Sequence, residues 1–583
     1  MALIVSDVST FFDPALCANN RQIVDGAVQI CQKGANNVCG NCKLVQYCSK
    51  QCQLSDWKHH KISCKSAFMK DSWEPTWFRK GRQPAFIGGA PLVPFGAQKY
   101  LWGNMPALDI LNSKNNEGEI KVIENDLALL FAASGDLRNV VTSLANLPET
   151  YEGECRVVLN DKEFIIVARN IIMLMTALLL DAKVAVPMII HLWYSAILPR
   201  VMVDVLQFSL LPLIEDVCTK IRNRPDGSMQ AKQFAFNGNK LRIVLKKEEW
   251  FNLAKFFIVP EAVTLEKSQM IRRRVTLAPE RVDYRERAML QWPCALREVD
   301  IHFRREGVLL PYGCSIAAFD TPNPTLFQDS DWPMKDSSNP REGWSYHKYM
   351  KHAPVAKADE HGAVFFYVRD LLNRFCTRLQ KAKISFQMSC MDARDLGPYL
   401  QDMKFDRIEI SNICDRGFLG PHSCVQIFSP LLKLRSDSPK AALLMLFLNA
   451  ATETENANKG SDKWRSDLMR AARRLDKYMP LDRTELGHIT NAGDPGFIRR
   501  TSCHDMFKDW EHWFDCFLKD SEFATFAHIH GLKIRKKHAI VEPWPYKIGV
   551  RTTKKEFDIL RAGSVTGYER YIELERQHNE DEG

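Results

Sequence analysis

The stretch that decides the fold is DLALLFAASGDLRNVVTSLANLP, residues 126–148. It opens with a continuous apolar run of strand length, passes one glycine, and continues with apolar residues at helical spacing until Pro148 closes the helix. A second short apolar run, CRVVLND at 155–161, is followed by a longer apolar helix, FIIVARNIIMLMTALLLD at 164–181. Alternation of strand and helix is typical of βαβ units, so these residues predict a parallel sheet covered by helices.

The same pattern returns much later in the chain. Further strands are predicted in ISFQMSCMDARDL (384–396), FDRIEISNI (405–413) and AALLMLFLNA (441–450). The stretch HGLKIRKKHAIVEPW (530–544) predicts an antiparallel hairpin at an edge of the sheet. Between the two halves lies a long segment with an apolar helix over 187–217, which we interpret as an insertion into one α/β domain.

We therefore expect an α/β protein: a small cysteine-rich unit, then a Rossmann-like parallel sheet with a large, mainly helical insertion. Neither half has enough strands to cover its own apolar helices, so both halves should form a single sheet. The expected division is an N-terminal tail (1–30), the cysteine-rich unit (31–64), an irregular connector (65–99), the first half of the Rossmann-like domain (100–185), the insertion (186–380), the second half (381–450) and a C-terminal region with the edge hairpin (451–583).

Composition narrows the class of protein. The chain has 583 residues, a net charge of +9 and 17 cysteines. This mild charge, without a dense basic face, argues against a nucleic-acid partner. The most apolar run, 171–180, ends at Asp181, well short of the roughly 18 residues that a membrane span needs. The N-terminus lacks a signal-peptide pattern and the cysteines form no secreted disulfide framework, so we expect a cytoplasmic or nuclear protein without a membrane partner.

Ligand-type residues gather in CGNCKLVQYCSKQCQLSDWKHHKISC, residues 39–64. The spacings are Cys39-x2-Cys42, Cys48-x3-Cys52 and His60-x3-Cys64. The x2 pair makes a tight turn that aims two sulfurs at one ion, and an x3 spacing places two ligands on successive turns of a helix. His59 lacks the x3 spacing, so His60 is the expected ligand. A closed site of this kind offers no open coordination position, which predicts that zinc stabilises the fold and that the surface carries the function.

This stretch resembles a MYND-type zinc finger in its YCSKQCQ core and its W-x2-H-x3-C ending. The resemblance implies two zinc ions in an interleaved order. One ion would be held by Cys39, Cys42, His60 and Cys64. The other would be held by Cys31, Cys48 and Cys52. The family places a further cysteine shortly after Cys31, where this chain has Gly34 and Ala35, so we expect the second site to be incomplete. A water or a vacancy is expected there rather than distant Cys17. MYND fingers bind proteins, often through short proline-rich peptides.

A second candidate site lies at the ends of the predicted strands. In an open parallel sheet, ligands bind beyond the carboxyl ends of the strands. An acid about 20–25 residues after the first loop glycine usually contacts ribose hydroxyls, and Asp161 fits that role; Asp392 is placed to meet an adenine amino group. These positions resemble the core of an S-adenosylmethionine-dependent methyltransferase. The candidate cofactor-binding residues are Gly135, Asp136, Asp161 and Asp392. The loop has a single glycine where such sites use several, so a structural remnant of the fold is the alternative.

A wider resemblance covers most of residues 35–450. The motifs are YLWGNMPALDILN, LALLFAASGDLRNVV, VVLNDKEFIIVARNI and FDRIEISNICDRGFLG. Together they resemble fungal proteins in which a MYND finger precedes the domain of unknown function 4470, a domain related to the N-terminal domain of dynein axonemal assembly factor 3. The first loop of many relatives is closer to Gly-Cys-Gly-Asp-x-Arg-Asn. This chain keeps Asp136, Arg138 and Asn139 and lacks one of the glycines.

Three functions are compatible with these motifs. The first is a zinc-binding protein-interaction adaptor on a methyltransferase-like scaffold. The second is an S-adenosylmethionine-dependent methyltransferase whose finger recruits a protein substrate; Asn412 follows the fourth strand, but outside an Asn-Pro-Pro-Tyr type motif, and no catalytic residue can be assigned. The third, a nucleic-acid-associated regulator, lacks interleaved basic and aromatic residues. We expect the adaptor, with the methyltransferase as the alternative.

Overall fold

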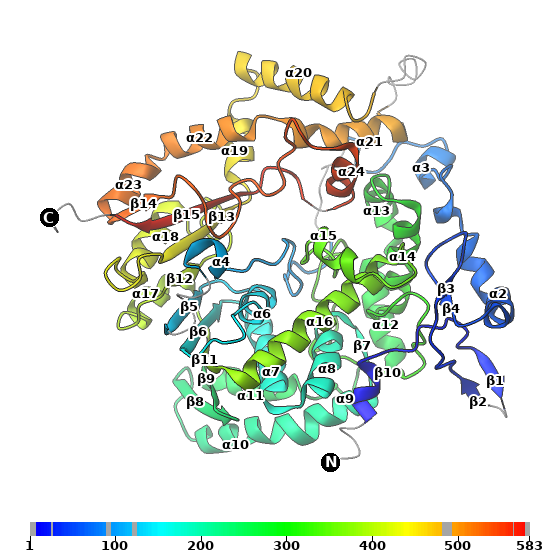
Figure 1. Cartoon of the computed structure of the whole chain (residues 1–583), viewed down its shortest axis with the longest axis horizontal. Coiled ribbons are helices and arrows are strands. Elements are labelled where there is room, and N and C mark those ends of the chain that lie inside the picture. The colour runs from blue at the N-terminus through cyan, green and yellow to red at the C-terminus, as the bar shows by residue number, and fades with distance from the viewer. Residues whose placement is uncertain are drawn as a thin grey trace.

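The computed structural model describes residues 7–24, 27–88, 95–118, 125–480, 492–563 and 565–577. A nine-stranded sheet with helices on both faces forms its centre (Figure 1). In spatial order the strands are β14 (Leu532–Ile534), β15 (Arg570–Arg576), β13 (Ala442–Phe447), β12 (Arg407–Glu409), β5 (Leu127–Phe131), β6 (Glu154–Asp161), β11 (Lys383–Cys390), β9 (Asn239–Lys246) and β8 (Met229–Phe236). The predicted α/β class is confirmed.

The middle of the sheet is parallel. The strands from β13 to β9 pair in parallel with one another. Strand β5 lies between β6 and β12, so the two halves of the chain on either side of residues 186–380 share one sheet. Strands β5, β6, β11, β12 and β13 take the doubly wound order 3-2-1-4-5, counted along the chain. Because the order reverses between β5 and β12, the carboxyl ends of these two strands mark the switch point.

Strand β5 shows why the sheet is covered on both faces. Leu127, Leu129 and Phe131 belong to one hydrophobic core, and Ala128 and Leu130, which point the other way, belong to a second core. The first core is closed by α6 (Arg138–Ala145), α7 (Phe164–Leu179), α8 (Ala182–Tyr194) and α16 (Glu360–Lys381). The second is closed by α18 (Pro421–Phe428), α22 (Trp510–Asp520) and α23 (Phe523–Ile529). A strand buried on both faces must be apolar throughout, as this run is.

Further helices surround these two layers. They are α3 (Thr76–Arg79), α4 (Ser113–Asn116), α9 (Arg200–Val205), α10 (Leu211–Ile221), α11 (Lys247–Lys255), α12 (Leu265–Thr276), α13 (Val282–Met289), α14 (Cys294–Glu306), α15 (Tyr346–Tyr349), α17 (Leu396–Tyr399), α19 (Ala450–Ala457), α20 (Asp462–Asp476), α21 (Pro495–His504) and α24 (Lys554–Ala562). In the described part of the chain, no helix has both the length and the apolar character that crossing a membrane requires.

The segment 186–380 differs from the expected insertion in two respects. Besides its helices it supplies the antiparallel pair β8 and β9, and β9 extends the sheet beyond β11. The predicted helix over 187–217 is also interrupted. Helix α8 ends at Tyr194, β7 (Ile197–Pro199) pairs with β10 (Phe319–Pro322), and α9 starts after Pro199. Pro199 explains the break, because proline disfavours helical backbone in the residue before it and lacks an amide donor.

The hairpin expected within 530–544 is wrong. Strand β14 does lie at the edge, but its antiparallel partner is β15, much later in the chain. The residues after β14 are held by the buried carboxylate of Glu573 on β15, which accepts hydrogen bonds from the amides of Ala539, Ile540 and Val541 at 3.0, 2.8 and 3.0 Å. Because these amides bond to a side chain and not to the backbone of a neighbouring strand, residues 539–541 form a loop.

The finger docks directly onto the α/β body. It consists of β3 (Asn37–Val38), β4 (Gln46–Tyr47) and α2 (Lys50–Cys64), and lies beside α14 at the right of Figure 1. Its core is shared with Val299 and Tyr312 of the body. The carboxylate of Glu298 on α14 accepts hydrogen bonds from Ser66 at 2.6 Å and from Tyr312 at 3.0 Å. The finger is therefore fixed in orientation by apolar and polar contacts.

Candidate metal centres and the carboxyl edge of the sheet

The first tetrad consists of four buried residues of the finger. They are Cys39, Cys42, His60 and Cys64. Their ligand atoms all lie within 4.8 Å of one another, with 3.7 Å between Cys39 Sγ and Cys64 Sγ and 3.4 Å between Cys42 Sγ and His60 Nε2. Metal–ligand bonds of about 2.0–2.3 Å in a tetrahedron place the ligand atoms about 3.3–3.8 Å apart. The spacing of the four atoms therefore fits zinc.

Local structure aims these ligands at one point. The chain turns between Cys42 and Leu44 through Lys43, whose φ is +57°, and the amide of Leu44 donates to Cys42 Sγ at 3.4 Å. Helix α2 carries His60 and Cys64 one turn apart on its buried face. Burial lowers the pKa of His60 to about 4, so its imidazole is neutral at pH 7 and able to bind a metal.

The second tetrad corrects the sequence analysis. Cys17 lies with Cys31, Cys48 and Cys52, and again all four sulfurs fall within 4.8 Å. The Cys31–Cys48 and Cys48–Cys52 sulfur distances are 3.6 and 3.3 Å, and the amide of Cys48 donates to Cys17 Sγ at 3.5 Å. The expectation of an incomplete site is wrong, because the N-terminal segment returns beside β4, where the amide of Ala18 bonds to the carbonyl of Gln46 at 3.0 Å.

Cys17 was considered and set aside because it has no ligand-type spacing to Cys31. The available signal was that Cys17 is the only other cysteine that precedes Cys31 in the sequence. With it, both tetrads have four protein ligands and fit structural zinc ions. Neither leaves a coordination position for water or substrate, so zinc bound here stabilises the finger and does not activate a nucleophile.

The strand ends of the predicted cofactor site do come together, as the parallel sheet requires. Gly135, at φ +54°, donates its amide to Asp161 Oδ2 at 2.9 Å, and Asp161 Oδ1 accepts from the amide of Glu163 at 3.0 Å. Asn170 on α7 donates to the carbonyl of Gly135 at 2.7 Å. Burial raises the pKa of Asp161 above its ordinary value. This carboxylate therefore ties the first loop to the end of β6.

Asp136 is bound by the protein itself. Its Oδ2 accepts from the amide of Gly103 at 2.7 Å and from Trp193 Nε1 at 3.3 Å, and its Oδ1 pairs with Arg138 Nη1 at 2.6 Å. Arg138 also donates to the carbonyl of Met105 at 2.9 Å. A Cβ atom on Gly103 would lie 1.9 Å from Arg138 Nη1, so any larger residue there would push the Arg138 guanidinium out of this arrangement. The segment around Gly103 is thus anchored over the first loop.

The switch point is filled by neighbouring chain. Met105, Leu446 and Tyr571 form a buried cluster at this edge of the sheet, and Glu409 at the end of β12 accepts from the amide of Ser411 at 2.7 Å. Asp392, at the end of β11, is more exposed and pairs with Arg394 at 2.8 Å, whose hydrogen bonds lower the pKa of Asp392 to about 2. These contacts give Gly135, Asp136, Asp161 and Asp392 structural partners, and none of them favours adenosylmethionine.

Fold and site together define a zinc-finger protein built on a Rossmann-like α/β body. Residues 29–64 match the family model of the MYND finger, and residues 101–198 match that of a Domain of unknown function (DUF4470). The chain thus contains a MYND finger, a module of protein–protein interaction, followed by a DUF4470 region. The matched finger includes every tetrad residue except Cys17.

Similarity to individual proteins is local. The chain is 48% identical over 40 residues to the Zinc finger MYND domain-containing protein 10 homolog of Drosophila melanogaster. The matched region is 7% of this chain and 9% of that protein. It is also 48% identical over 44 residues to the Ubiquitin carboxyl-terminal hydrolase 19 of Arabidopsis thaliana. That matched region is 7% of this chain and 6% of that protein. The chain therefore spans less than a tenth of either relative. No solved structure matches it.

Proposed function

We propose that this chain is a non-catalytic adaptor: the finger binds a protein partner, and the methyltransferase-like body holds the finger in a fixed orientation. The observation that carries the proposal is an apolar stripe of three exposed side chains along α2. Leu54, Trp57 and Ile62 are 63%, 36% and 76% exposed. At about 100° per residue, Leu54 lies between Trp57 and Ile62 around the helix, and the three positions span about 140°. Trp57 is at the border with the inner face.

The two faces of α2 have different tasks. Its inner face carries His60 and Cys64 to the first tetrad, and Asp56, which accepts a hydrogen bond from the hydroxyl of Tyr47 at 2.8 Å. This face is held by metal ligation and by the finger core. Leu54 and Ile62 contribute nothing to that core, and Trp57 meets it only through an edge contact with the His60 ring, with 6.0 Å between ring centroids. The exposed parts of these large apolar side chains stay in water unless a partner covers them.

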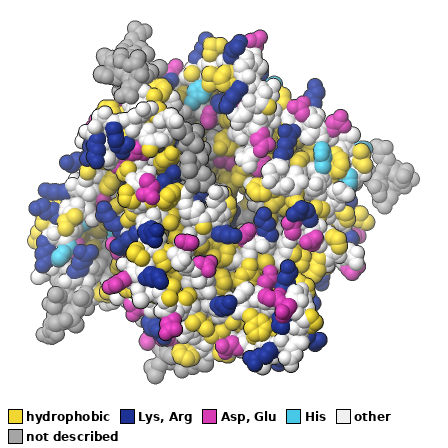
Figure 2. Space-filling model, turned by 180° about the vertical axis from the view of Figure 1, so that it is seen from behind, with side chains coloured by type: hydrophobic (Ala, Val, Ile, Leu, Met, Phe, Trp, Pro, Cys, Tyr) yellow, Lys and Arg dark blue, Asp and Glu magenta, His cyan; other side chains and the backbone are white. Residues whose placement is uncertain are grey.

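Charge around the stripe indicates the chemistry of the partner. Four lysines of the finger helix and its end are exposed, and the single acid of α2, Asp56, is buried. They are Lys50, Lys58, Lys61 and Lys65. Lysine and arginine side chains are frequent on this side of the molecule, at the left of Figure 2. An exposed tryptophan suits the flat face of a polyproline helix. The partner segment that we propose is a short proline-rich peptide that also carries acidic residues.

The proposal also includes a related domain and a cellular compartment, and each rests on a less direct observation. The DUF4470 region supports a distant relation to the N-terminal domain of dynein axonemal assembly factor 3. All 17 cysteines are free of disulfides, which supports a reducing compartment, the cytoplasm or the nucleus. A methyltransferase activity would need a ligand to displace the chain's own contacts with Asp136 and Asp161, so we do not propose it.

Peptide binding tests the adaptor directly. The full zinc-loaded chain is titrated by fluorescence polarisation with a set of labelled proline-rich peptides, each in an acidic and a neutral version. We expect an acidic version to bind, and Trp57→Ala to weaken it at least tenfold with zinc content unchanged. Phe208→Ala is the matched control, since Phe208 is 57% exposed but lies on the body. Absence of binding across the set, or full affinity in Trp57→Ala, would contradict the proposal.

A further inference from the structure

A cavity of about 670 Å³ opens at the edge of the sheet opposite the switch point. It is lined by the residues that follow α6, by the last turns of α16, and by the loop 107–114. Residues 146–149 lead into β6, and the end of α16 leads into β11, so the cavity lies at the amino ends of the parallel strands. It is therefore a different place from the carboxyl edge, where a Rossmann-like sheet usually gathers its ligands. Its volume is in the range of small-molecule sites.

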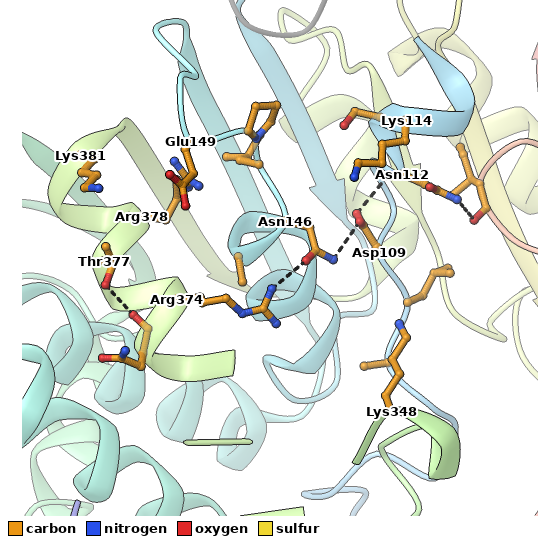
Figure 3. A pocket seen from close by; sticks show the side chains of 18 residues that line it. Asp109, Asn112, Lys114, Asn146, Glu149, Lys348, Arg374, Thr377, Arg378 and Lys381 are labelled. Atoms are coloured by element: carbon orange, nitrogen blue, oxygen red, sulfur yellow. Dashed lines mark hydrogen bonds between the residues drawn. The ribbon is translucent and has the colours of Figure 1, made fainter. Parts of the chain in front are cut away.

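The lining is strongly cationic. Five of its side chains are basic and two are acidic, which gives a net charge of +3. The basic residues are Lys114, Lys348, Arg374, Arg378 and Lys381, and the acidic ones are Asp109 and Glu149. Figure 3 shows them entering from different sides, with the residues of α16 facing those of the 109–114 loop and Lys348 approaching from α15. Gathering like charges around one hollow is unfavourable unless an anion offsets their repulsion.

Polar contacts across the cavity engage only part of this set. Arg374 Nη1 donates to Asn146 Oδ1 at 3.3 Å, and Asn146 Nδ2 donates to Asp109 Oδ2 at 3.0 Å (Figure 3). Asp109 Oδ1 accepts from the amides of Leu111 and Asn112 at 3.0 and 3.1 Å. This acid is therefore bound to backbone and amide groups. Burial raises its pKa, and the charge of Lys348 opposes that rise.

Arg378 provides the second observation. Arg378 is only 8% exposed, and its buried Nε has no hydrogen-bond partner. Within the described residues, its guanidinium makes no hydrogen bond and no ion pair within 4.0 Å, and the lining acid Glu149 attracts it only from a longer distance. The ammonium groups of Lys348 and Lys381 likewise make no hydrogen bond or close ion pair in the described part of the chain. A buried donor without a partner is costly, since Nε has lost water and gained no hydrogen bond. The cost is removed when an oxyanion occupies the cavity beside it.

Helix ends do not account for these charges. Cations do favour the C-terminal ends of helices, and Arg374, Arg378 and Lys381 lie in the last turns of α16. Lys114 and Lys348, however, come from α4 and α15, whose positions are independent of that helix end. The C-terminal ends of α6 and α16 would also oppose an anion, so a binding site here needs several cations.

We propose that this cavity is a binding site for a small phosphorylated molecule, whose phosphate oxygens are held by Arg378 and Arg374 with Lys348 and Lys381 around them. Guanidinium groups match phosphate oxygens in a two-pronged geometry, and phosphate brings the two or more negative charges that a +3 lining requires. The site is separate from the finger, so its success or failure does not depend on the proposed peptide binding.

Calorimetric titration of the full zinc-loaded chain tests the site. The probes are inorganic tripolyphosphate and ATP, at 50 and 300 mM salt. We expect both to bind, more weakly at the higher salt, and Arg378→Leu to reduce the affinity at least tenfold. The matched control is Arg222→Leu, an exposed arginine at the end of α10, which should bind as the unmodified chain does. Because Arg378 has no partner to lose, Arg378→Leu should melt no lower than the unmodified chain.

Lys348→Gln, at an exposed position, provides a second variant that cannot disturb the core and should weaken both probes several-fold. Absence of heat with either probe at millimolar concentration would overturn the proposal. Equal affinity in Arg378→Leu, Lys348→Gln and the control would also overturn it, since the anion would then bind elsewhere. Binding of a hexaglutamate peptide, with tripolyphosphate inert, would assign the cavity to an acidic protein segment and would equally refute a phosphate site.

Discussion

Replacement of Asp136 by alanine distinguishes a structural first loop from a cofactor site. The carboxylate pairs with Arg138 at 2.6 Å, and the two side chains are only 2% and 12% exposed. It also accepts from the Gly103 amide and from the Trp193 ring nitrogen. Alanine at position 136 would leave two orphaned donors and a buried guanidinium that has lost its ion pair and keeps only the more distant attraction of Glu409.

The buried guanidinium of Arg138 accounts for most of the stability that Asp136→Ala is expected to lose. Breaking a buried ion pair by removing one partner costs about 3–5 kcal/mol. At about 2–4 °C per kcal/mol for a cooperative unit of 150–250 residues, we expect Tm to fall by about 6–20 °C. Asp136→Asn, which keeps an acceptor but loses the charge, should fall between alanine and the unmodified chain.

Differential scanning calorimetry of the full chain, with zinc content measured in parallel, checks this expectation. The control is Asp392→Ala, whose pair with Arg394 lies at the surface, and its Tm should be unchanged. The reasoning is refuted if Asp136→Ala melts within about 2 °C of the unmodified chain, a loss near 1 kcal/mol or less. It is also refuted if adenosylmethionine raises the Tm of the unmodified chain and Asp136→Ala loses that response without being destabilised.

Two further predictions concern the second tetrad and the end of β12. Cys17→Ala should reduce the zinc content of the purified chain from two ions to one, because the second tetrad loses a ligand; metal analysis that still returns two ions would show that Cys17 is not a ligand. Burial raises the pKa of Glu409 from 4.5 to about 7. Between these two pH values the folded state therefore binds more protons than the unfolded state. The contribution of Glu409 to the free energy of unfolding falls as pH rises through that window. Glu409→Gln stays neutral, so its Tm relative to the unmodified chain should be higher at pH 8 than at pH 5; an equal difference at both pH values would contradict the assignment.

Local pattern was sufficient for much of the fold. The apolar runs that became β5 and β13 were recognisable because strands buried on both faces are apolar over their whole length. Strands β6, β11 and β12 were predicted from shorter apolar stretches, since they also carry polar or charged residues, among them Arg407 and Glu409 of β12. Six of the eight zinc ligands were recognisable from short spacings, since a tight turn or one helical turn forces such neighbours toward one point. Cys31 followed from the resemblance to MYND fingers.

Features that depend on distant residues were missed. Strand β14 pairs with β15, and Glu573 of β15 binds the amides of 539–541; no spacing within 530–544 contains that information. Residues 229–246 join the sheet although they lie in the segment expected to be mainly helical. A strand can pair with any of several other strands, and tertiary contacts determine which pairing forms.

The sequence alone determined the class of this protein: a zinc finger followed by a doubly wound sheet, because the periods of 2 and 3.6 residues and the ligand spacings are local properties of the chain. Only the tertiary structure decided what the charged residues do. It brought Cys17 to the second tetrad, gave Asp136 and Asp161 to the protein's own amides and to Arg138, and left Arg378 without a partner in a cationic cavity. The physical reason is that the role of a charge is set by the partners and the burial around it, and these come from elements far apart in the sequence.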